Sequence, residues 1–189
     1  MSKKLASILI LLLGILQIVI FINPAFAART CLNVPTLQGS YNCGAACASM
    51  ITNYFKGDTT NREKTAWNNR TTYTSNCALC TGNDWYVCTT YYAVQDLADE
   101  EGGDYQHSGD LALGTVKSKV DSETPTPLQA ILCDYQGGGH GIVVKGYNTG
   151  NDDEDDNILY NDPYDGYGHS RSLAWIEENW DIHGKAYWK

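Results

Sequence analysis

The segment Gln38–Gly57, QGSYNCGAACASMITNYFKG, carries the strongest helix signal in the chain. From Cys43 onward, apolar side chains recur at intervals of three and four residues, the spacing that places them on one face of a helix. Asn42 is a favourable N-cap residue, and Gly57 is a favourable residue for ending a helix. The sequence therefore predicts a helix that begins at Cys43 and ends before Gly57.

Cys43 stands in the first turn of this expected helix. Unpaired backbone N–H groups and a partial positive charge at a helix N-terminus favour a thiolate over a thiol. The thiolate is the reactive form of cysteine, which makes Cys43 a candidate nucleophile. Cys47 lies one turn later and is the alternative, but the helix start and the position of Gln38, five residues before Cys43, favour Cys43.

A catalytic thiol needs a base and a group that orients the base. Among the four histidines, His140 is the one that opens an apolar strand after three glycines. If residues 141–147 pair with 158–160 as a hairpin, Asp162 returns towards His140. A carboxylate there could hold one imidazole nitrogen.

The oxyanion of an acyl-transfer intermediate needs preorganised donors. The side-chain amide of Gln38 and the backbone N–H of Cys43 are the candidates. Taken singly, each candidate has an ordinary structural interpretation, because cysteines at helix starts and Asp-Pro turns are common. The order Gln, Cys, His, Asp along the chain favours the catalytic interpretation.

A helix followed by antiparallel strands with short helices among them predicts an α+β fold. The length is that of one domain, expected over residues 28–189, in which 58–125 is variable and 57–90 is polar and loop-like. The other expected elements are helices at 91–101, 115–122 and 172–180, and strands at 128–135, 140–147, 158–160 and 186–188.

Two blocks of sequence resemble bacterial peptidases that trim double-glycine leader peptides. Gln38–Gly57 is similar to their active-site segment, with a Gln ahead of a Cys-Gly-x-Ala core and an apolar helix. Gly139–Tyr147 resembles their Gly-His-x-Val-Val strand, and Tyr160–Pro163 resembles their Asp-Pro turn. Residues 58–125 match no part of the pattern.

The resemblance implies a papain-like fold in which the N-terminal active-site helix packs on an antiparallel sheet. It also implies that Cys43 is the nucleophile, His140 the base, Asp162 the orienting group and Gln38 an oxyanion donor. We expect a secreted, stand-alone cysteine endopeptidase that hydrolyses peptide bonds through an acyl-enzyme.

Two alternatives to the endopeptidase stay open. One is a catalytically silent papain-like module that binds proteins, and the other is a cysteine acyltransferase or amidase on the same scaffold. The expected partner is a peptide or protein substrate, and the expected state is a monomer. No cofactor or metal is expected.

The first 27 residues read as an export signal. Lys3 and Lys4 precede an apolar run over 5–22, and Ala25-Phe26-Ala27 supplies the small residues of a cleavage site. The alternative is an uncleaved membrane anchor. We expect a secreted or extracytoplasmic protein, in the periplasm or at the cell surface, without stable membrane association after cleavage.

The charge excludes some partners. The whole chain has a formal net charge of −9, and without the two lysines of the signal the charge is −11. Such a polyanion is a poor partner for nucleic acid or for anionic lipid.

Seven cysteines are expected to meet an oxidising compartment, where most pair as disulfides. The odd number leaves one thiol over. With Cys43 as that thiol, six cysteines remain for three disulfides: Cys31, Cys47, Cys77, Cys80, Cys88 and Cys133. The Cys77-x-x-Cys80 pair has a zinc or redox alternative. The acidic run 151–157 suggests calcium, but a solvated hairpin turn is the simpler interpretation.

Overall fold

The computed structural model describes residues 29–40, 42–69, 105–108, 111–135, 138–150, 157–180 and 182–188. The helices in these ranges are α2 (Cys43–Lys56), α3 (Glu63–Asn69), α5 (Leu113–Val120) and α6 (Leu173–Trp180). The strands are β1 (Arg29–Cys31), β2 (Tyr105–Ser108), β3 (Leu128–Tyr135), β4 (Gly138–Asn148), β5 (Asn157–Asp162), β6 (Tyr167–Ser172) and β7 (Ile182–Trp188).

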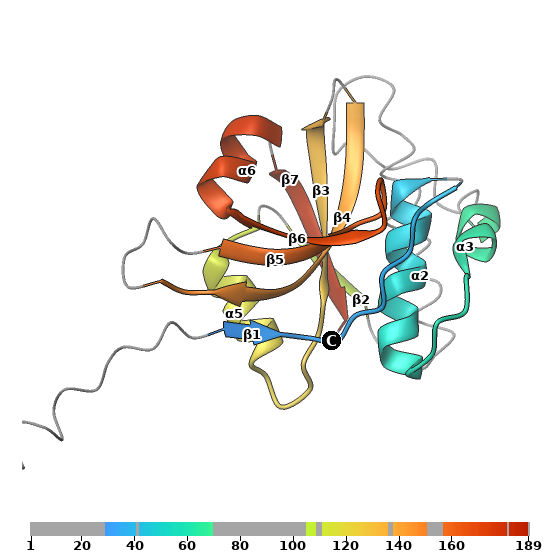
Figure 1. Cartoon of the computed structure of the whole chain (residues 1–189), viewed down its shortest axis with the longest axis horizontal. Coiled ribbons are helices and arrows are strands. Elements are labelled where there is room, and N and C mark those ends of the chain that lie inside the picture. Colours follow the sequence, from blue (N-terminus) through green and yellow to red (C-terminus); the bar gives the residue numbers. More distant parts are fainter. Residues whose placement is uncertain are drawn as a thin grey trace, which may run out of the picture.

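The described strands form one seven-stranded sheet in which every pairing is antiparallel. Its order is β2-β7-β3-β4-β5-β6, and β1 pairs with β4 outside this path. Helices α2 and α3 lie on one side of the sheet, while α5 and α6 lie on the other (Figure 1). The expected α+β class, with the N-terminal helix packed on an antiparallel sheet, is confirmed.

Strand β4 separates two hydrophobic cores by the alternation of its side chains. Val143 packs against α2 in the first core. Ile142 and Val144 point the other way, into the second core, which contains residues of β3, β5, α5 and α6. The strand that carries His140 is therefore buried on both faces, so its position is strongly constrained.

Helix α2 begins and ends where the sequence predicts. Asn42 has an extended backbone and caps the helix with its side chain. Gly57 has a φ of 66°, and its backbone N–H bonds the Asn53 carbonyl. All residues from Gly44 to Asn53 are buried, which is the pattern of a helix enclosed on all sides rather than one at the surface.

The first turns of α2 approach β4 at Gly141. A Cβ atom at Gly141 would lie 3.5 Å from Cys47 Sγ and 3.6 Å from Gly44 Cα. Both distances are ordinary van der Waals contacts, so the helix packs directly against the backbone of β4 here. Because His140 is the neighbouring residue of β4, this contact also sets the distance between the helix start and the imidazole.

Most of the elements expected from the pattern are present. The hairpin of β4 and β5 pairs Val143 with Asn161 and Val144 with Tyr160, as the expected pairing requires. The expected strand 128–135 is β3, and the helix expected at 115–122 begins two residues earlier, at Leu113.

The loop-like interpretation of 57–90 is wrong for Glu63–Asn69, which form α3. Three short strands were not expected: β1, β2 and β6. The helix expected at 91–101 and the signal at 1–27 lie outside the described residues. Within the described part of the chain, no helix is both long enough and apolar enough to cross a membrane.

Strand β1 joins the sheet at Gly146, which pairs with Cys31. Gly146 also pairs with Leu159 of β5, so β1 must lie along the edge of β4 that faces away from β5. A Cβ at Gly146 would meet the backbone of Thr30 and come within 2.8 Å of Cys31 Cα. A backbone atom cannot move aside as a flexible side chain can.

We predict that Gly146→Ala lowers the free energy of unfolding by about 1–3 kcal/mol, because the added methyl group displaces β1. Gly114→Ala is the matched control, since a Cβ at Gly114 in helix α5 has nothing within 4 Å. That control should be neutral or stabilising, because alanine is the better helix former. Urea unfolding measures both, and equal effects of the two substitutions would contradict the proposed clash.

Candidate active site

Cys43 occupies the first position of α2, directly after its cap. The Asn42 Oδ1 atom accepts a hydrogen bond from the backbone N–H of Gly44 at 3.0 Å, and one from Ala45 at 3.4 Å. These bonds fix the first turn of the helix, and the helix N-terminus is an environment that favours an anion. The Cys43 sulfur is therefore held on a rigid element at the positive end of its dipole.

Burial separates the two cysteines of α2. Cys43 is half-buried and lines a cleft, whereas Cys47 is completely buried. Burial raises the pKa of the Cys47 thiol, and the charges of Cys43 and Asp162 raise it further. Cys47 is thus a neutral thiol of the core, and Cys43 is the thiol of α2 that is accessible from the cleft.

His140 and Asp162 lie close together on adjacent strands. The His140 Nε2 atom is 2.7 Å from Asp162 Oδ1, and both side chains are buried. The same carboxylate oxygen accepts the backbone N–H of Tyr164 at 2.8 Å. The contact with Nε2 leaves Nδ1 of the imidazole to face another group.

Three influences set the protonation of His140. Burial by itself lowers the pKa of the imidazole. The hydrogen bond with Asp162, followed by the interaction with the Cys43 side chain, acts in the opposite direction, and together they raise the pKa to about 9. His140 therefore interacts with both Cys43 and Asp162 and favours its charged form near neutral pH.

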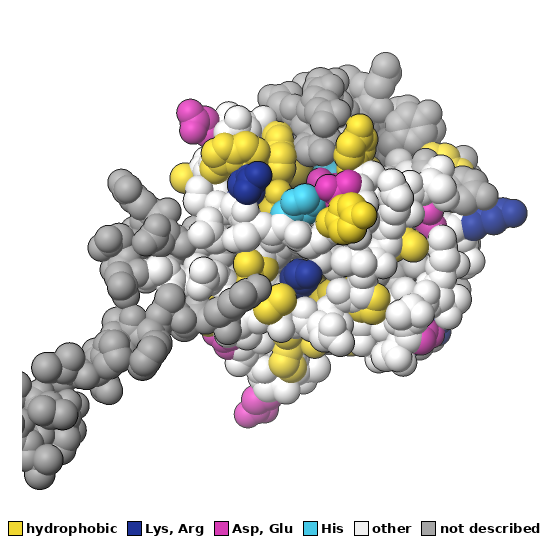
Figure 2. Space-filling view, in the orientation of Figure 1, with side chains coloured by type: hydrophobic (Ala, Val, Ile, Leu, Met, Phe, Trp, Pro, Cys, Tyr) yellow, Lys and Arg dark blue, Asp and Glu magenta, His cyan; other side chains and the backbone are white. Residues whose placement is uncertain are grey.

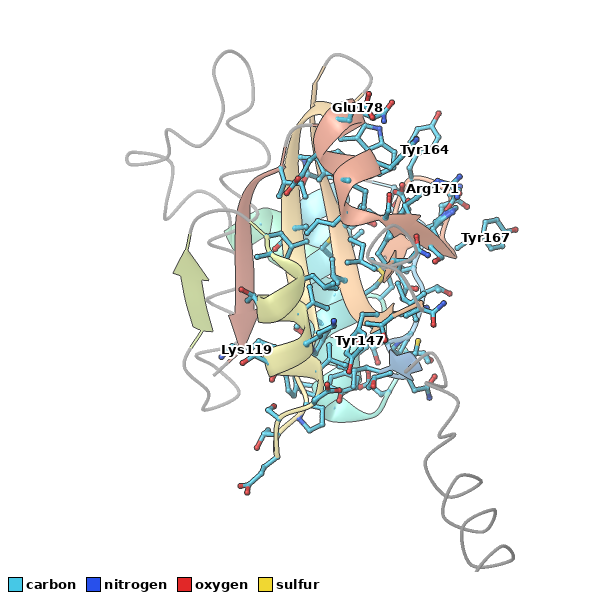
Figure 3. All side chains as sticks on the ribbon, turned by 90° about the vertical axis from the view of Figure 1, so that its left-hand side faces the viewer. Lys119, Tyr147, Tyr164, Tyr167, Arg171 and Glu178 are labelled. Atoms are coloured by element: carbon cyan, nitrogen blue, oxygen red, sulfur yellow. The ribbon has the colours of Figure 1, made fainter. Side chains whose placement is uncertain are left out.

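A cleft of about 310 Å³ opens at this point of the molecule. It brings together the segment before α2, the start of β4 and the turn after β5; its lining residues are Gly39, Ser40, Asn42, Cys43, His140, Pro163 and Tyr164. Tyr164 is 64% exposed, so its ring stands at the rim of the cleft rather than in the core. Figure 3 shows Tyr164 projecting outward from the sheet.

Exposed aromatic side chains lie on the turn after β5, on β6 and on α6. Tyr164, Tyr167 and Trp175 are the large hydrophobic side chains found exposed within the described ranges. Arg171 lies over the Trp175 ring, with its guanidinium carbon 5.2 Å from the ring centroid. Figure 2 shows hydrophobic, basic, acidic and histidine side chains side by side on this face.

One backbone hydrogen bond joins the two walls of the cleft. The N–H of Gly39 donates to the carbonyl of Pro163 at 2.8 Å. Gly166, with a φ of 76°, ends the same turn, and a Cβ there would lie 2.9 Å from Gln38 Cβ. The segment before Cys43 therefore packs directly on the turn that follows Asp162.

Gln38 does not line the cleft in this structure. Its side chain is exposed, and its Nε2 atom is 3.5 Å from the carbonyl oxygen of Tyr164. That distance is at the outer limit for a hydrogen bond. The role of Gln38 as an oxyanion donor stays a prediction, whereas Cys43, His140 and Asp162 are brought together.

The sequence pattern gave no indication of two residues that shape the site. Tyr164 follows the Asp-Pro pair and forms the rim. Glu63 comes from α3, is fully buried, and accepts hydrogen bonds from the segment before Cys43. A single acid in a polar stretch has no local pattern that announces such a long-range contact.

The expected disulfides of Cys31 and Cys47 are not present, so this expectation is corrected. Cys31, Cys43 and Cys47 are all free thiols. Cys47, on α2, lies in the core next to Gly141 of β4. Cys31 is exposed and lies near the start of the described part of the chain. Counting cysteines therefore does not single out Cys43. Cys77, Cys80 and Cys88 lie outside the described residues, and the side chain of Cys133 is not described.

Among the residues that the structure describes, no three His, Cys, Asp or Glu side chains gather closely enough to hold a metal ion. Most of the acidic run 151–157 lies outside those residues.

Papain-like cysteine peptidases place a thiol at a helix start so that it faces an imidazole on the adjacent sheet. A carboxylate hydrogen-bonds the other side of that imidazole. The α+β fold, with α2 packed on an antiparallel sheet, is that of the papain-like C39 type. The model of the peptidase C39-like family matches residues 30–187, and the chain belongs to that family. A search of curated proteins finds no match.

We predict that Asp162→Asn moves the pKa of His140 from about 9 back towards its ordinary value of 6.5, because the largest influence that raises it is removed. A group with a raised pKa stabilises the fold below its ordinary pKa, and this contribution is lost as the pH rises through the raised value. The stability difference between the wild type and Asp162→Asn should therefore be largest below pH 6.5 and decline as the pH rises through about 9.

NMR titration of the imidazole and denaturant unfolding across this pH range measure the two effects. Asp165→Asn is the matched control, because Asp165 forms a second carboxylate–imidazole pair, with His169 at 3.0 Å, that is more exposed. The control should leave the titration of His140 unchanged. An unchanged His140 pKa in Asp162→Asn would contradict the assigned cause.

Proposed function

We propose that this chain is a cysteine endopeptidase that hydrolyses peptide bonds through an acyl-enzyme. Its family is one of peptidases, which act on peptides or proteins. The observation that carries the proposal is the cleft in which the half-buried Cys43 meets His140, itself bonded to Asp162 at 2.7 Å. A structural cysteine would need neither the cleft nor the pair.

In the proposed reaction, the Cys43 sulfur forms a bond to the substrate carbonyl carbon, and the carbonyl electrons move to the oxygen. Protonated His140 gives its proton to the leaving nitrogen as the C–N bond breaks. Water then loses a proton to His140 and attacks the thioester, which releases the acid and the thiolate. Asp162 holds Nε2 throughout, so Nδ1 is the nitrogen that exchanges protons with the reacting groups.

The oxyanion is held by the backbone N–H of Cys43 and by the side chain of Gln38 in this proposal. Gln38 must turn from the Tyr164 carbonyl into the cleft to do so. The 3.5 Å contact is weak enough to be exchanged for a bond to a charged oxygen. Substrate binding at Tyr164 would favour this exchange.

The compartment is part of the proposal. Lys3 and Lys4, the apolar run and the Ala-Phe-Ala site support export and cleavage after Ala27. We accordingly expect a secreted or extracytoplasmic monomer that acts on peptides or proteins outside the cytoplasm.

We predict that Cys43→Ala lowers peptide hydrolysis by at least about 1,000-fold, because the substrate loses its nucleophile. A mixed peptide library with mass spectrometry of the products is the measurement. Addition of one water per cleavage identifies hydrolysis, whereas products that join an acyl group to an added amine identify the acyltransferase alternative.

Iodoacetamide labelling of the folded protein, mapped by peptide mass, gives an independent measurement. Cys43 should be alkylated, and Cys47→Ala should leave this label in place because Cys47 is buried. A Cys31→Ser parent removes the exposed thiol of Cys31, which would otherwise compete for reagent. Labelling of Cys47 in place of Cys43 would sink the assignment of the nucleophile.

We also predict that the protein isolated from the exported fraction of its host begins at Ala28, because the signal is cleaved after Ala27. Mass spectrometry of the intact chain reads this directly. A chain that retains Lys3 and Lys4 in the membrane fraction would support the uncleaved anchor.

A further inference from the structure

The backbone just before the nucleophile bonds to a carboxylate that the catalytic scheme does not use. The N–H of Ser40 lies 2.9 Å from Oε1 of Glu63 and 3.0 Å from Oε2. The N–H of Asn42 donates to Oε1 at 2.9 Å, and the Ser40 hydroxyl donates to Oε2 at 3.1 Å. Ser40 and Asn42 both line the cleft, and Asn42 is the cap of α2.

The burial of Glu63 makes these bonds important. Its side chain is completely buried, although it sits in the first turn of α3, where an acid would serve the helix equally well from the surface. Burying a carboxylate is costly unless hydrogen bonds replace the lost water. Bonds from N–H and O–H donors to a charged oxygen are short and strong, so they both compensate Glu63 and fix the donors.

Glu63 holds the segment from one side while the turn after Asp162 holds it from the other. A Cβ at Gly39 would lie 3.2 Å from Ala46 Cβ, 3.5 Å from Glu63 Oε1 and 3.6 Å from the Pro163 oxygen. Gly39 is thus packed among α2, Glu63 and the turn. Its own N–H bonds the Pro163 carbonyl at 2.8 Å.

We infer that Glu63 is a positioning residue for the nucleophile Cys43 and for the backbone N–H of Cys43, the oxyanion donor that directly follows the Asn42 cap. Its carboxylate presets the backbone at Ser40 and Asn42, so that the N-cap of α2 and the cleft wall beside Cys43 are in place before substrate arrives. Preorganised donors cost no reorganisation during the reaction, which is why a fixed wall accelerates acyl transfer. This inference rests on the proposed function, and it gives Glu63, which follows α2 in the sequence, a role in positioning Cys43.

The central test replaces Glu63 with Gln, which has the same shape but can accept through only one of its two terminal atoms. We expect Glu63→Gln to lower kcat by about 10- to 100-fold with little change in KM, because a displaced reacting group slows chemistry more than binding. The rate of iodoacetamide alkylation of Cys43 should fall as well, and its pH profile should change. A merely structural role for Glu63 would lower stability without altering these rates in the folded protein.

Asp58→Asn is the matched control. Asp58 forms a bidentate pair with Arg62, at 2.7 Å for each contact, in the same connection between α2 and α3. The control therefore loosens the neighbouring segment but leaves the bonds of Glu63 to Ser40 and Asn42 in place. Its kcat and alkylation rate should stay within about twofold of the wild type, measured where circular dichroism shows each variant folded.

Hydrogen exchange of the wild type covers the case in which Glu63→Gln does not fold. Ser40 and Asn42 line an open cleft, where amide protons usually exchange quickly. Their amide protons should nevertheless exchange slowly, because both donate hydrogen bonds to Glu63. Rapid exchange of both would overturn the inference. So would a folded Glu63→Gln variant with wild-type kcat and alkylation rate.

The alkylation rate also separates this inference from the proposed function. If the wild type cleaves no peptide but Glu63→Gln still slows alkylation of Cys43, the peptidase proposal fails and the positioning role stands. If the wild type cleaves peptides through Cys43 and Glu63→Gln changes neither rate, the positioning role fails and the peptidase proposal stands.

Discussion

The close contact of α2 with β4 at Gly141 is the constraint on which the site depends. Three groups converge on the missing side chain: Gly44 Cα, Cys47 Sγ and, at 3.3 Å from the Cβ position, Gln129 Nε2. A Cβ alone would make ordinary van der Waals contact with the helix, but a side chain longer than that of alanine would displace it. Since Cys43 begins the helix and His140 precedes Gly141, any such displacement would act directly on the thiol–imidazole pair.

The register of the sheet constrains the site as well, because it sets the positions of His140 and Asp162. His140 and Asp162 lie on neighbouring antiparallel strands, so their 2.7 Å contact is set by the register of β4 and β5. A slip of one residue would turn one of the two side chains to the opposite face. The core formed by Ile142, Val144 and Tyr160 resists that slip, because these side chains would lose the packing that they make in it. Hydrophobic packing thereby fixes the polar pair.

The residues that could be predicted from the sequence are those with a local signal. The helix of Cys43 follows from its periodicity, its cap and its glycine stop. His140 and Asp162 follow from a hairpin whose strands are recognisable in themselves. The contacts of Glu63 could not be predicted, because an acid in a polar stretch reveals neither its burial nor its distant partners. Strands β1, β2 and β6 were missed because such short strands depend on the sheet they join.

The three free thiols show that the surroundings of each cysteine distinguish Cys43 better than the number of cysteines does. Cysteine counting assumed that every cysteine but one would pair, yet Cys31 and Cys47 are both unpaired. Cys47 lies in the core as a small apolar side chain, and burial keeps it neutral. Cys31 is exposed, and its sulfur lies 3.7 Å from the neighbouring Leu32 carbonyl. Of the three, Cys43 alone combines a helix start, access from a cleft and a neighbouring imidazole. Because this combination does not depend on the redox state of the other cysteines, the argument for Cys43 survives the loss of the disulfides expected for Cys31 and Cys47.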